Sequence, residues 1–178
     1  ECAWGAGFID NVNGTPYRWT QATPAVRYYL DKGDVSSSIL HAEGRTLVDA
    51  AFARWGNVST SWLTSASFED AGDDANDIDG TNWTDYISIS ADGSALQVLK
   101  DYSIILFDKN GAIFTQLFGA GSANLVLGLG SPGGYNASTV TITKGFAIIN
   151  GAAQGISSPS IAATLTHELG HLLNLAHV

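Results

Sequence analysis

Methionine is absent from the 178-residue chain, and cysteine occurs only once, at Cys2. A single cysteine cannot form a disulfide within the chain, so the fold cannot depend on disulfide bridges. The first residue is Glu1 rather than an initiator methionine. We therefore expect a mature, secreted and extracellular protein from which a signal or pro-segment has been removed.

Positive charge is also scarce, because 8 Lys and Arg stand against 17 Asp and Glu, for a net charge of −9. A chain with so few basic residues has no surface that neutralises phosphates, which argues against nucleic acid as a partner. Uninterrupted apolar runs are short as well, and none approaches the roughly 18 residues of a membrane-spanning helix. The composition therefore predicts no nucleic-acid binding and no membrane anchor.

Apolar residues are plentiful by contrast. Hydrophobic residues make up 45% of the chain, and only 14% of the residues are charged. These proportions are typical of a globular protein, and a chain of this length can bury a substantial core. We expect one domain that spans residues 1–178 and is rich in strands.

The chemically informative stretch is His167-Glu168-Leu-Gly-His171-Leu-Leu-Asn174-Leu-Ala-His177. Residues four apart in a helix lie on one face, so His167 and His171 can bind one metal ion from the same side. His177 follows six residues later and can join them only if the chain turns back. Asn174 stands where that turn is needed, and Asn tolerates the left-handed conformation better than most residues. The spacing predicts three histidines around one metal ion.

This run resembles the zinc-binding signature of the metzincin metallopeptidases, His-Glu-x-x-His-x-x-Gly-x-x-His, with Asn174 in place of the usual glycine. The resemblance implies that His167, His171 and His177 bind zinc and that Glu168 is the general base. It further implies a zinc-dependent endopeptidase that hydrolyses protein or peptide substrates with metal-activated water. Some metzincins are kept latent by a pro-segment cysteine on the zinc. Cys2 is either such a ligand or a free or intermolecularly paired thiol.

Two features separate the chain from that family. Metzincins continue after the third histidine into a C-terminal subdomain with a Met-bearing turn, whereas this chain has no Met and ends at Val178. We therefore expect a catalytic domain truncated after His177. Two alternatives remain open. One is a non-catalytic metal-binding or structural module on the same scaffold, and the other is a carbohydrate- or surface-binding domain that uses exposed Trp and Tyr residues.

Hydrophobic periodicity predicts a sheet accompanied by two long helices. One helix is expected over residues 40–56, and the other is expected to begin with Ser158 as its N-cap and to carry the zinc motif. Strands are expected over residues 25–30, 59–69, 86–89, 102–107, 112–117 and 140–149. Combined with the resemblance, this predicts an α+β fold like the metzincin N-terminal subdomain, with a twisted mixed sheet of about five strands.

The strands of the second half lead to specific expectations. Residues 102–107 form a nearly continuous apolar run, which is typical of a strand buried on both faces. The sequence Asp108-Lys109-Asn110-Gly111 predicts a tight turn, after which residues 112–117 return as a hairpin strand. Residues 119–134 are interpreted as a glycine-rich surface loop over the sheet edge. Residues 140–149 are the expected edge along which an extended substrate would pair.

An acidic loop precedes these strands. It contains five aspartates, at Asp70, Asp73, Asp74, Asp77 and Asp79. An EF-hand is excluded because Ala75 stands where the first ligand is required and Tyr86 stands where a bidentate acid is required. Oxygen-rich loops of other geometries bind calcium, and metzincins often contain structural calcium ions. A structural Ca²⁺ site and a solvated turn both remain open.

Overall fold

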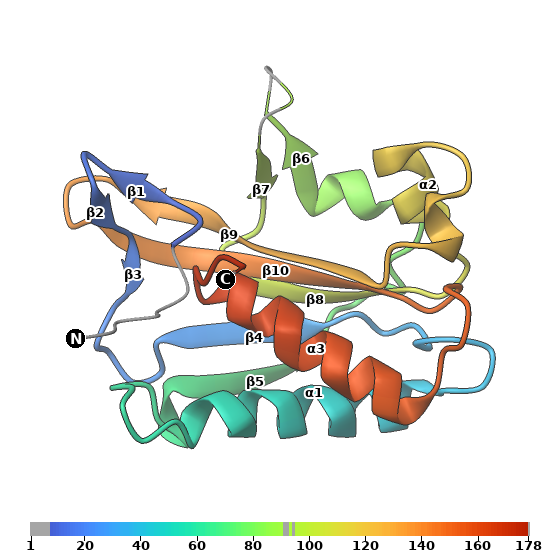
Figure 1. Ribbon diagram of the computed structural model, residues 1–178, viewed down its shortest axis with the longest axis horizontal. Coiled ribbons are helices and arrows are strands. Elements are labelled where there is room, and N and C mark those ends of the chain that lie inside the picture. The colour runs from blue at the N-terminus through green and yellow to red at the C-terminus, as the bar shows by residue number, and fades with distance from the viewer. Residues whose placement is uncertain (1–7, 91–92, 94, 178) are drawn as a thin grey trace.

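The computed structural model describes residues 8–90, 93 and 95–177. It has three layers, in which a twisted sheet lies between two long helices on one face and a short helix with a β-hairpin on the other (Figure 1). The described helices are α1 (His41–Gly56), α2 (Ala112–Phe118) and α3 (Ser158–Leu172). None of the described helices combines the length and the apolar character of a membrane span. Cys2 lies outside the described residues, so the hypotheses about its thiol stay predictions.

The central sheet has six strands. Their bounds are β3 (Arg18–Trp19), β4 (Val26–Leu30), β5 (Phe68–Asp73), β8 (Ser103–Asp108), β9 (Gly128–Asn136) and β10 (Thr141–Asn150). Along the order β3-β10-β8-β4-β5 all pairings are parallel, whereas β9 pairs with β10 in antiparallel orientation. Two antiparallel ribbons complete the described strands, β1 (Asn11–Val12) with β2 (Thr15–Pro16) and β6 (Ile87–Ile89) with β7 (Leu96–Val98).

Strand β8 runs through the middle of the core, and every one of its residues is buried. Because successive side chains of a strand point to opposite faces, Ile105 and Phe107 pack on the side of α1 and α3. Ile104 and Leu106 pack on the other side, against α2 and the β6–β7 hairpin. The prediction that this segment is buried on both faces is therefore confirmed.

The predicted fold class is wrong. The protein is not an α+β fold like the metzincin N-terminal subdomain, with a mixed sheet of about five strands and two long helices; it is α/β, with a mainly parallel six-stranded sheet and a third helix. The two long helices do occur where they were expected. Helix α2, however, replaces the expected hairpin strand at residues 112–117.

The neighbours of β8 explain why residues 112–117 do not pair with it as a hairpin strand. Its two edges are already occupied by the parallel strands β4 and β10, which leaves no edge for a hairpin partner. The turn residues instead satisfy the first N–H groups of a helix. The Asp108 carboxylate accepts a hydrogen bond from the Phe114 N–H (2.9 Å), and the Asn110 side chain accepts one from the Ala112 N–H (3.1 Å).

Strand β9 forms an edge of the sheet, contrary to expectation. The strand predicted at residues 140–149 exists as β10, but it lies inside the sheet, between β8 and β9. Among the described strand pairings, β10 is the only partner of β9. Nearly half of the segment interpreted as a surface loop, from residue 128 onward, therefore belongs to the edge strand.

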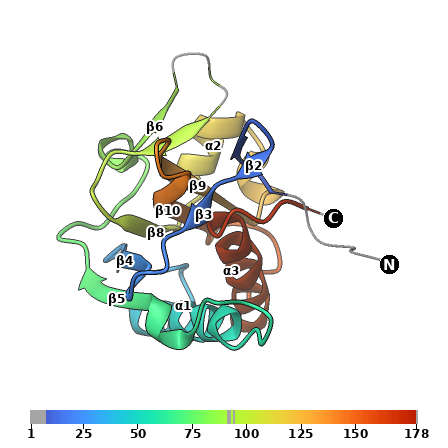
Figure 2. The same ribbon diagram turned by 90° about the vertical axis from the view of Figure 1, so that its left-hand side faces the viewer.

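Helices α1 and α3 pack side by side beneath the sheet (Figures 1 and 2). The Trp55 indole of α1 donates a hydrogen bond to the Thr166 carbonyl of α3 (2.9 Å). A Cβ atom on Gly170 would lie 2.8 Å from the Trp55 ring, so a glycine is needed at this crossing. The contacts fix the position of α3 relative to the sheet.

Candidate metal centre

Helix α3 presents the metal motif. Its N-cap is Ser157, one residue before the predicted Ser158, and the Ser157 and Ser160 side chains each accept a hydrogen bond from the other's N–H group. One face of the helix packs into the core through four fully buried side chains: Ile161, Leu165, Leu169 and Leu172. His167 is exposed and His171 is half-buried, and their rings meet edge to face one turn apart. The helix therefore has one face in the core and another face that carries two of the three predicted ligands.

Helix α3 ends in a Schellman motif centred on Asn174. Asn174 has a φ of 77°, the Asn174 N–H donates to the His171 carbonyl (2.8 Å), and the Leu175 N–H donates to the Gly170 carbonyl (3.0 Å). This confirms the prediction that the chain turns back at Asn174 in the left-handed conformation. The turn brings His177 to the other two histidines.

The three imidazoles converge on one point. The Nε2 atoms of His167 and His171 are 3.0 Å apart, those of His167 and His177 are 3.0 Å apart, and those of His171 and His177 are 2.9 Å apart. Among the described residues, these three histidines are the only group of at least three His, Cys, Asp or Glu side chains whose ligand atoms lie within 4.8 Å of one another. The predicted ligand set is therefore assembled in space.

The donor set fits a metal ion such as zinc. Zinc binds imidazole nitrogen at about 2.0–2.1 Å, so two ligands of a tetrahedral zinc lie about 3.3–3.4 Å apart. The observed separations are a few tenths of an ångström shorter. The His171 Nδ1–H donates to the Leu175 carbonyl at 2.6 Å, which leaves the Nε2 lone pair of this ring free for a metal.

The electrostatics also favour the neutral form of one of the three rings, that of His167. Burial lowers the pKa of His167 below its ordinary value, and the neighbouring rings of His171 and His177 lower it further. Metal ligation requires the neutral form of the ring. His167 is thus held in the protonation state in which it can bind a metal.

Glu168 lies beside this group in a largely buried position. Its exposed fraction is 7%, and burial raises the pKa of its carboxyl to about 7, against the opposing effect of a hydrogen bond from the Gly130 backbone. Glu168 and His167 line the same cleft of about 470 Å³, together with Thr164 of α3 and Gly128 of β9. The predicted general base and one predicted ligand therefore face the same space.

Two glycines of β9 allow this strand to approach α3. A Cβ atom on Gly130 would lie 2.1 Å from the Glu168 carbonyl oxygen, and one on Gly128 would lie 2.7 Å from the Glu168 Cγ atom. Sequence analysis missed their role because it placed both residues in a loop. Their spacing of two residues, the period of one strand face, was the available signal.

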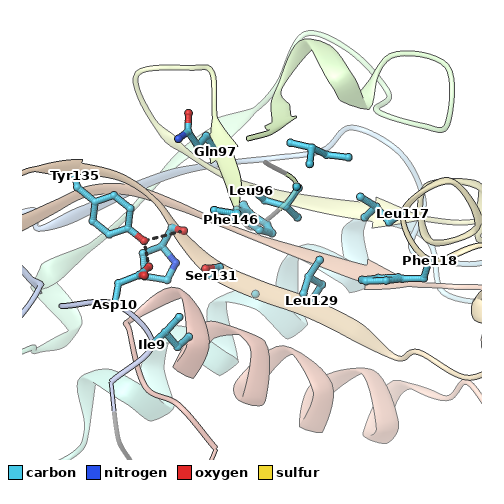
Figure 3. A pocket seen from close by; sticks show the side chains of 15 residues that line it. Ile9, Asp10, Leu96, Gln97, Leu117, Phe118, Leu129, Ser131, Tyr135 and Phe146 are labelled. Carbon is cyan, nitrogen blue, oxygen red and sulfur yellow. Dashed lines mark hydrogen bonds between the residues drawn. The ribbon is translucent and has the colours of Figure 1, made fainter. Parts of the chain in front are cut away.

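A second cavity lies on β9 away from the cleft. It has a volume of about 410 Å³ and lies between β9, β7, α2 and residues 9–10 (Figure 3). Its lining is mostly apolar and includes Leu96, Leu129 and Phe146. None of the three histidines contributes to it. The cavity is therefore separate from the metal centre.

The acidic loop differs from the histidine group, because most of its carboxylates contact protein donors. Contrary to the prediction, its first two aspartates, Asp70 and Asp73, belong to strand β5. The Arg45 guanidinium pairs with both Asp70 and Asp73, and Asp74 accepts hydrogen bonds from two tyrosine hydroxyls. Within the described residues, no three carboxylates of this loop form a group whose ligand atoms lie within 4.8 Å of one another, as those of the three histidines do. Calcium binding by the loop stays a prediction.

Comparison of the chain with models of protein families, with curated proteins and with solved structures found no match.

Proposed function

We propose that this chain is a zinc-dependent endopeptidase that resembles the metzincins in its zinc motif. The observation that carries the proposal is the convergence of three Nε2 atoms at 2.9–3.0 Å, with Glu168 in the adjoining cleft. Three histidine ligands are characteristic of catalytic zinc sites, whereas structural sites use four protein ligands. Secretion of the protein stays a prediction.

His167, His171 and His177 would hold the ion. When bound, zinc supplies a Lewis acid that polarises a carbonyl and lowers the pKa of a coordinated water toward ~7. The histidines contribute their neutral Nε2 atoms, and the hydrogen bond from the His171 Nδ1–H to the Leu175 carbonyl keeps that ring in orientation. The protein therefore provides a pre-organised set of ligands.

Glu168 would act as the general base. Its carboxylate can accept a proton in the cleft and deliver it to the departing amine, which is the proton movement that peptide hydrolysis requires. Burial supports this assignment, because a carboxyl group with a pKa of about 7 can both take and release a proton near neutral pH. Its position next to His167 in sequence keeps the two groups together.

The substrate would be a polypeptide in extended conformation. The cleft begins at residues 127–128, where β9 starts, and β9 is an edge strand. An edge strand offers backbone N–H and C=O groups with which an extended peptide can pair. We therefore propose that the substrate pairs with β9 rather than with residues 140–149.

The test is Glu168→Gln, a substitution of nearly equal shape. Wild-type protein is expected to contain zinc and to cleave members of a broad peptide library, and a chelator should stop the cleavage. The variant should lose cleavage by about 10²–10⁴-fold while its zinc content, measured by elemental analysis, is unchanged. Cleavage retained in the variant would refute the role of Glu168. Zinc without cleavage in the wild type would instead favour the non-catalytic metal-binding module.

A further inference from the structure

The N-terminal segment, residues 8–19, lies against the turn that follows α3. The Ile9 N–H donates to the Asn174 carbonyl (3.3 Å), and Phe8 forms an antiparallel bridge with Leu175. These contacts join the two ends of the described chain (Figure 1). The bridge involves Leu175, whose carbonyl accepts the hydrogen bond from His171.

The Asn174 side chain is the centre of this contact. It is fully buried, and its three hydrogen bonds go to the N-terminal segment. Its Oδ1 atom accepts from the Asp10 N–H (2.8 Å), and its Nδ2 group donates to the Asp10 carbonyl (3.0 Å) and the Tyr17 carbonyl (2.8 Å). A glycine would allow the same positive φ but would make none of these bonds. The turn alone does not explain why Asn occupies this position.

The N-terminal segment is in turn held by the edge strand. The Tyr135 hydroxyl of β9 donates a hydrogen bond to the Asp10 carboxylate (Figure 3). The rings of Tyr17 and Tyr135 are in contact, with centroids 4.7 Å apart. A connected set of contacts therefore runs from β9 through Asp10 and Tyr17 to Asn174.

His177 depends on this turn more than the other ligands do. His167 and His171 belong to α3, whose core face is fully buried, whereas His177 follows the helix and is exposed. Its position is set by the path of the chain through Asn174 and Leu175. Both residues contact the N-terminal segment.

We propose that Asn174 is a positioning residue whose amide couples the N-terminal segment to the third metal ligand, so that metal affinity depends on the hydrogen bonds of Asn174 with Asp10 and Tyr17. The inference rests on the proposed metal site. It concerns how the site is assembled, and it can be tested without measuring cleavage.

The experiment measures zinc affinity by competition with a chromogenic chelator for the wild type, Asn174→Gly, His177→Ala and the double variant. Loss of a residue that orients a ligand is expected to lower affinity about 10–100-fold. If Asn174 acts through His177, the double variant should be no weaker than His177→Ala alone. The absorption spectrum of the Co²⁺-loaded Asn174→Gly protein should resemble that of Co²⁺-loaded His177→Ala. Additive losses, or unchanged affinity in Asn174→Gly, would overturn the proposal.

Asn13→Gly is the matched control. Asn13 also has a positive φ, of 50°, but it is exposed in the turn between β1 and β2. Its replacement should leave zinc affinity unchanged, and an equal loss in both variants would count against a specific role for Asn174. If wild-type protein binds no zinc, the proposed function fails; if it binds zinc and Asn174→Gly binds equally well, only this inference fails.

A second variant covers the case in which Asn174→Gly does not fold, as judged by circular dichroism. Tyr135→Phe removes only the hydroxyl that donates to Asp10. A loss of zinc affinity of about threefold or more, absent in the His177→Ala background, would support the coupling. A smaller loss of zinc affinity, or a loss that persists in the His177→Ala background, would contradict the coupling.

Discussion

The histidine trio and the acidic loop are both rich in residues that bind metals, yet they are built differently. In the trio, the ring nitrogens of His167, His171 and His177 point at one another across 2.9–3.0 Å. In the acidic segment, Asp70 and Asp73, which lie in β5, are paired with Arg45. The number of potential ligand residues in a segment therefore does not by itself predict that their ligand atoms converge. What distinguishes the two regions is whether protein donors already occupy the ligand atoms.

The energetic reason is desolvation. A buried polar group is costly unless it has a partner, and a carboxylate with good hydrogen-bond donors has already met this requirement. Asp74 accepts from the Tyr86 hydroxyl (2.7 Å) and the Tyr102 hydroxyl (2.8 Å). The three Nε2 atoms have mainly one another, and an ion would satisfy all three at once.

The largest effect is expected from His171→Ala. The substitution removes one ligand nitrogen from the trio, and zinc affinity should fall by more than about 100-fold, since even the loss of an outer-shell partner costs 10–100-fold. Competition with a chelator measures the change. His41→Ala is the control, because the His41 Nε2 atom lies 2.9 Å from an Asp73 carboxylate oxygen. Unchanged affinity in His171→Ala would remove the basis for the metal site.

Asp31 is a buried carboxylate whose hydrogen-bond donors are backbone N–H groups. It has no exposed surface and accepts hydrogen bonds from the N–H groups of Gly33 (2.8 Å), Ile78 (2.9 Å) and Phe107 (3.0 Å). Burial nevertheless raises its pKa to about 6, above the ordinary 3.8, although the three N–H groups oppose the rise. These bonds connect the acidic loop to the ends of β4 and β8.

An effect of intermediate size is expected for Asp31, which makes the free energy of unfolding depend on pH. Folded protein holds the Asp31 proton more tightly than the unfolded chain does, so this contribution to stability is complete below pH 3.8 and is lost as pH rises through about 6. The free energy of unfolding of the wild type, relative to Asp31→Asn, should therefore fall by roughly 2–3 kcal/mol between pH 4 and pH 7. Urea titrations at several pH values measure it.

Asp74→Asn provides the control of opposite sign. Burial acts to raise the pKa of Asp74, but the hydrogen bonds from Tyr86 and Tyr102 outweigh it and hold the pKa below 3.8. This carboxylate contributes stability above pH 3.8 and loses it as the pH falls through its folded pKa. The gap between wild type and Asp74→Asn should close in acid. If both variants showed the same trend, the contrast between the two carboxylates would be wrong.

The smallest effect is expected from calcium. If the loop carboxylates keep their protein partners, 1 mM Ca²⁺ should raise the free energy of unfolding by less than about 0.4 kcal/mol, the value for a site with a Kd near 1 mM. Thermal unfolding with and without Ca²⁺ measures this. Arg45→Ala, which removes the guanidinium that pairs with Asp70 and Asp73, should respond more strongly. A stabilisation above about 1 kcal/mol in the wild type would support the structural calcium site.

The sequence predicted correctly those features whose conformation depends on a single continuous segment. The burial of residues 102–107, the two long helices and the left-handed Asn174 all follow from patterns within about a dozen residues. It failed at residues 112–117, whose apolar spacing suits a strand as well as a helix. It also failed to recognise β9, because a glycine-rich run is typical of a loop unless its partner strand is known.

The spacing of His167, His171 and His177, with Asn174 between them, was sufficient to predict that the three imidazoles converge, because helix periodicity and the left-handed turn are properties of the local backbone. Only the tertiary structure decided what surrounds that set. The approach of Gly130 to Glu168 and the hydrogen bond between Asp10 and Asn174, 164 positions apart, join segments that no local pattern connects. Burial, and with it the pKa of Glu168, depends on such long-range contacts.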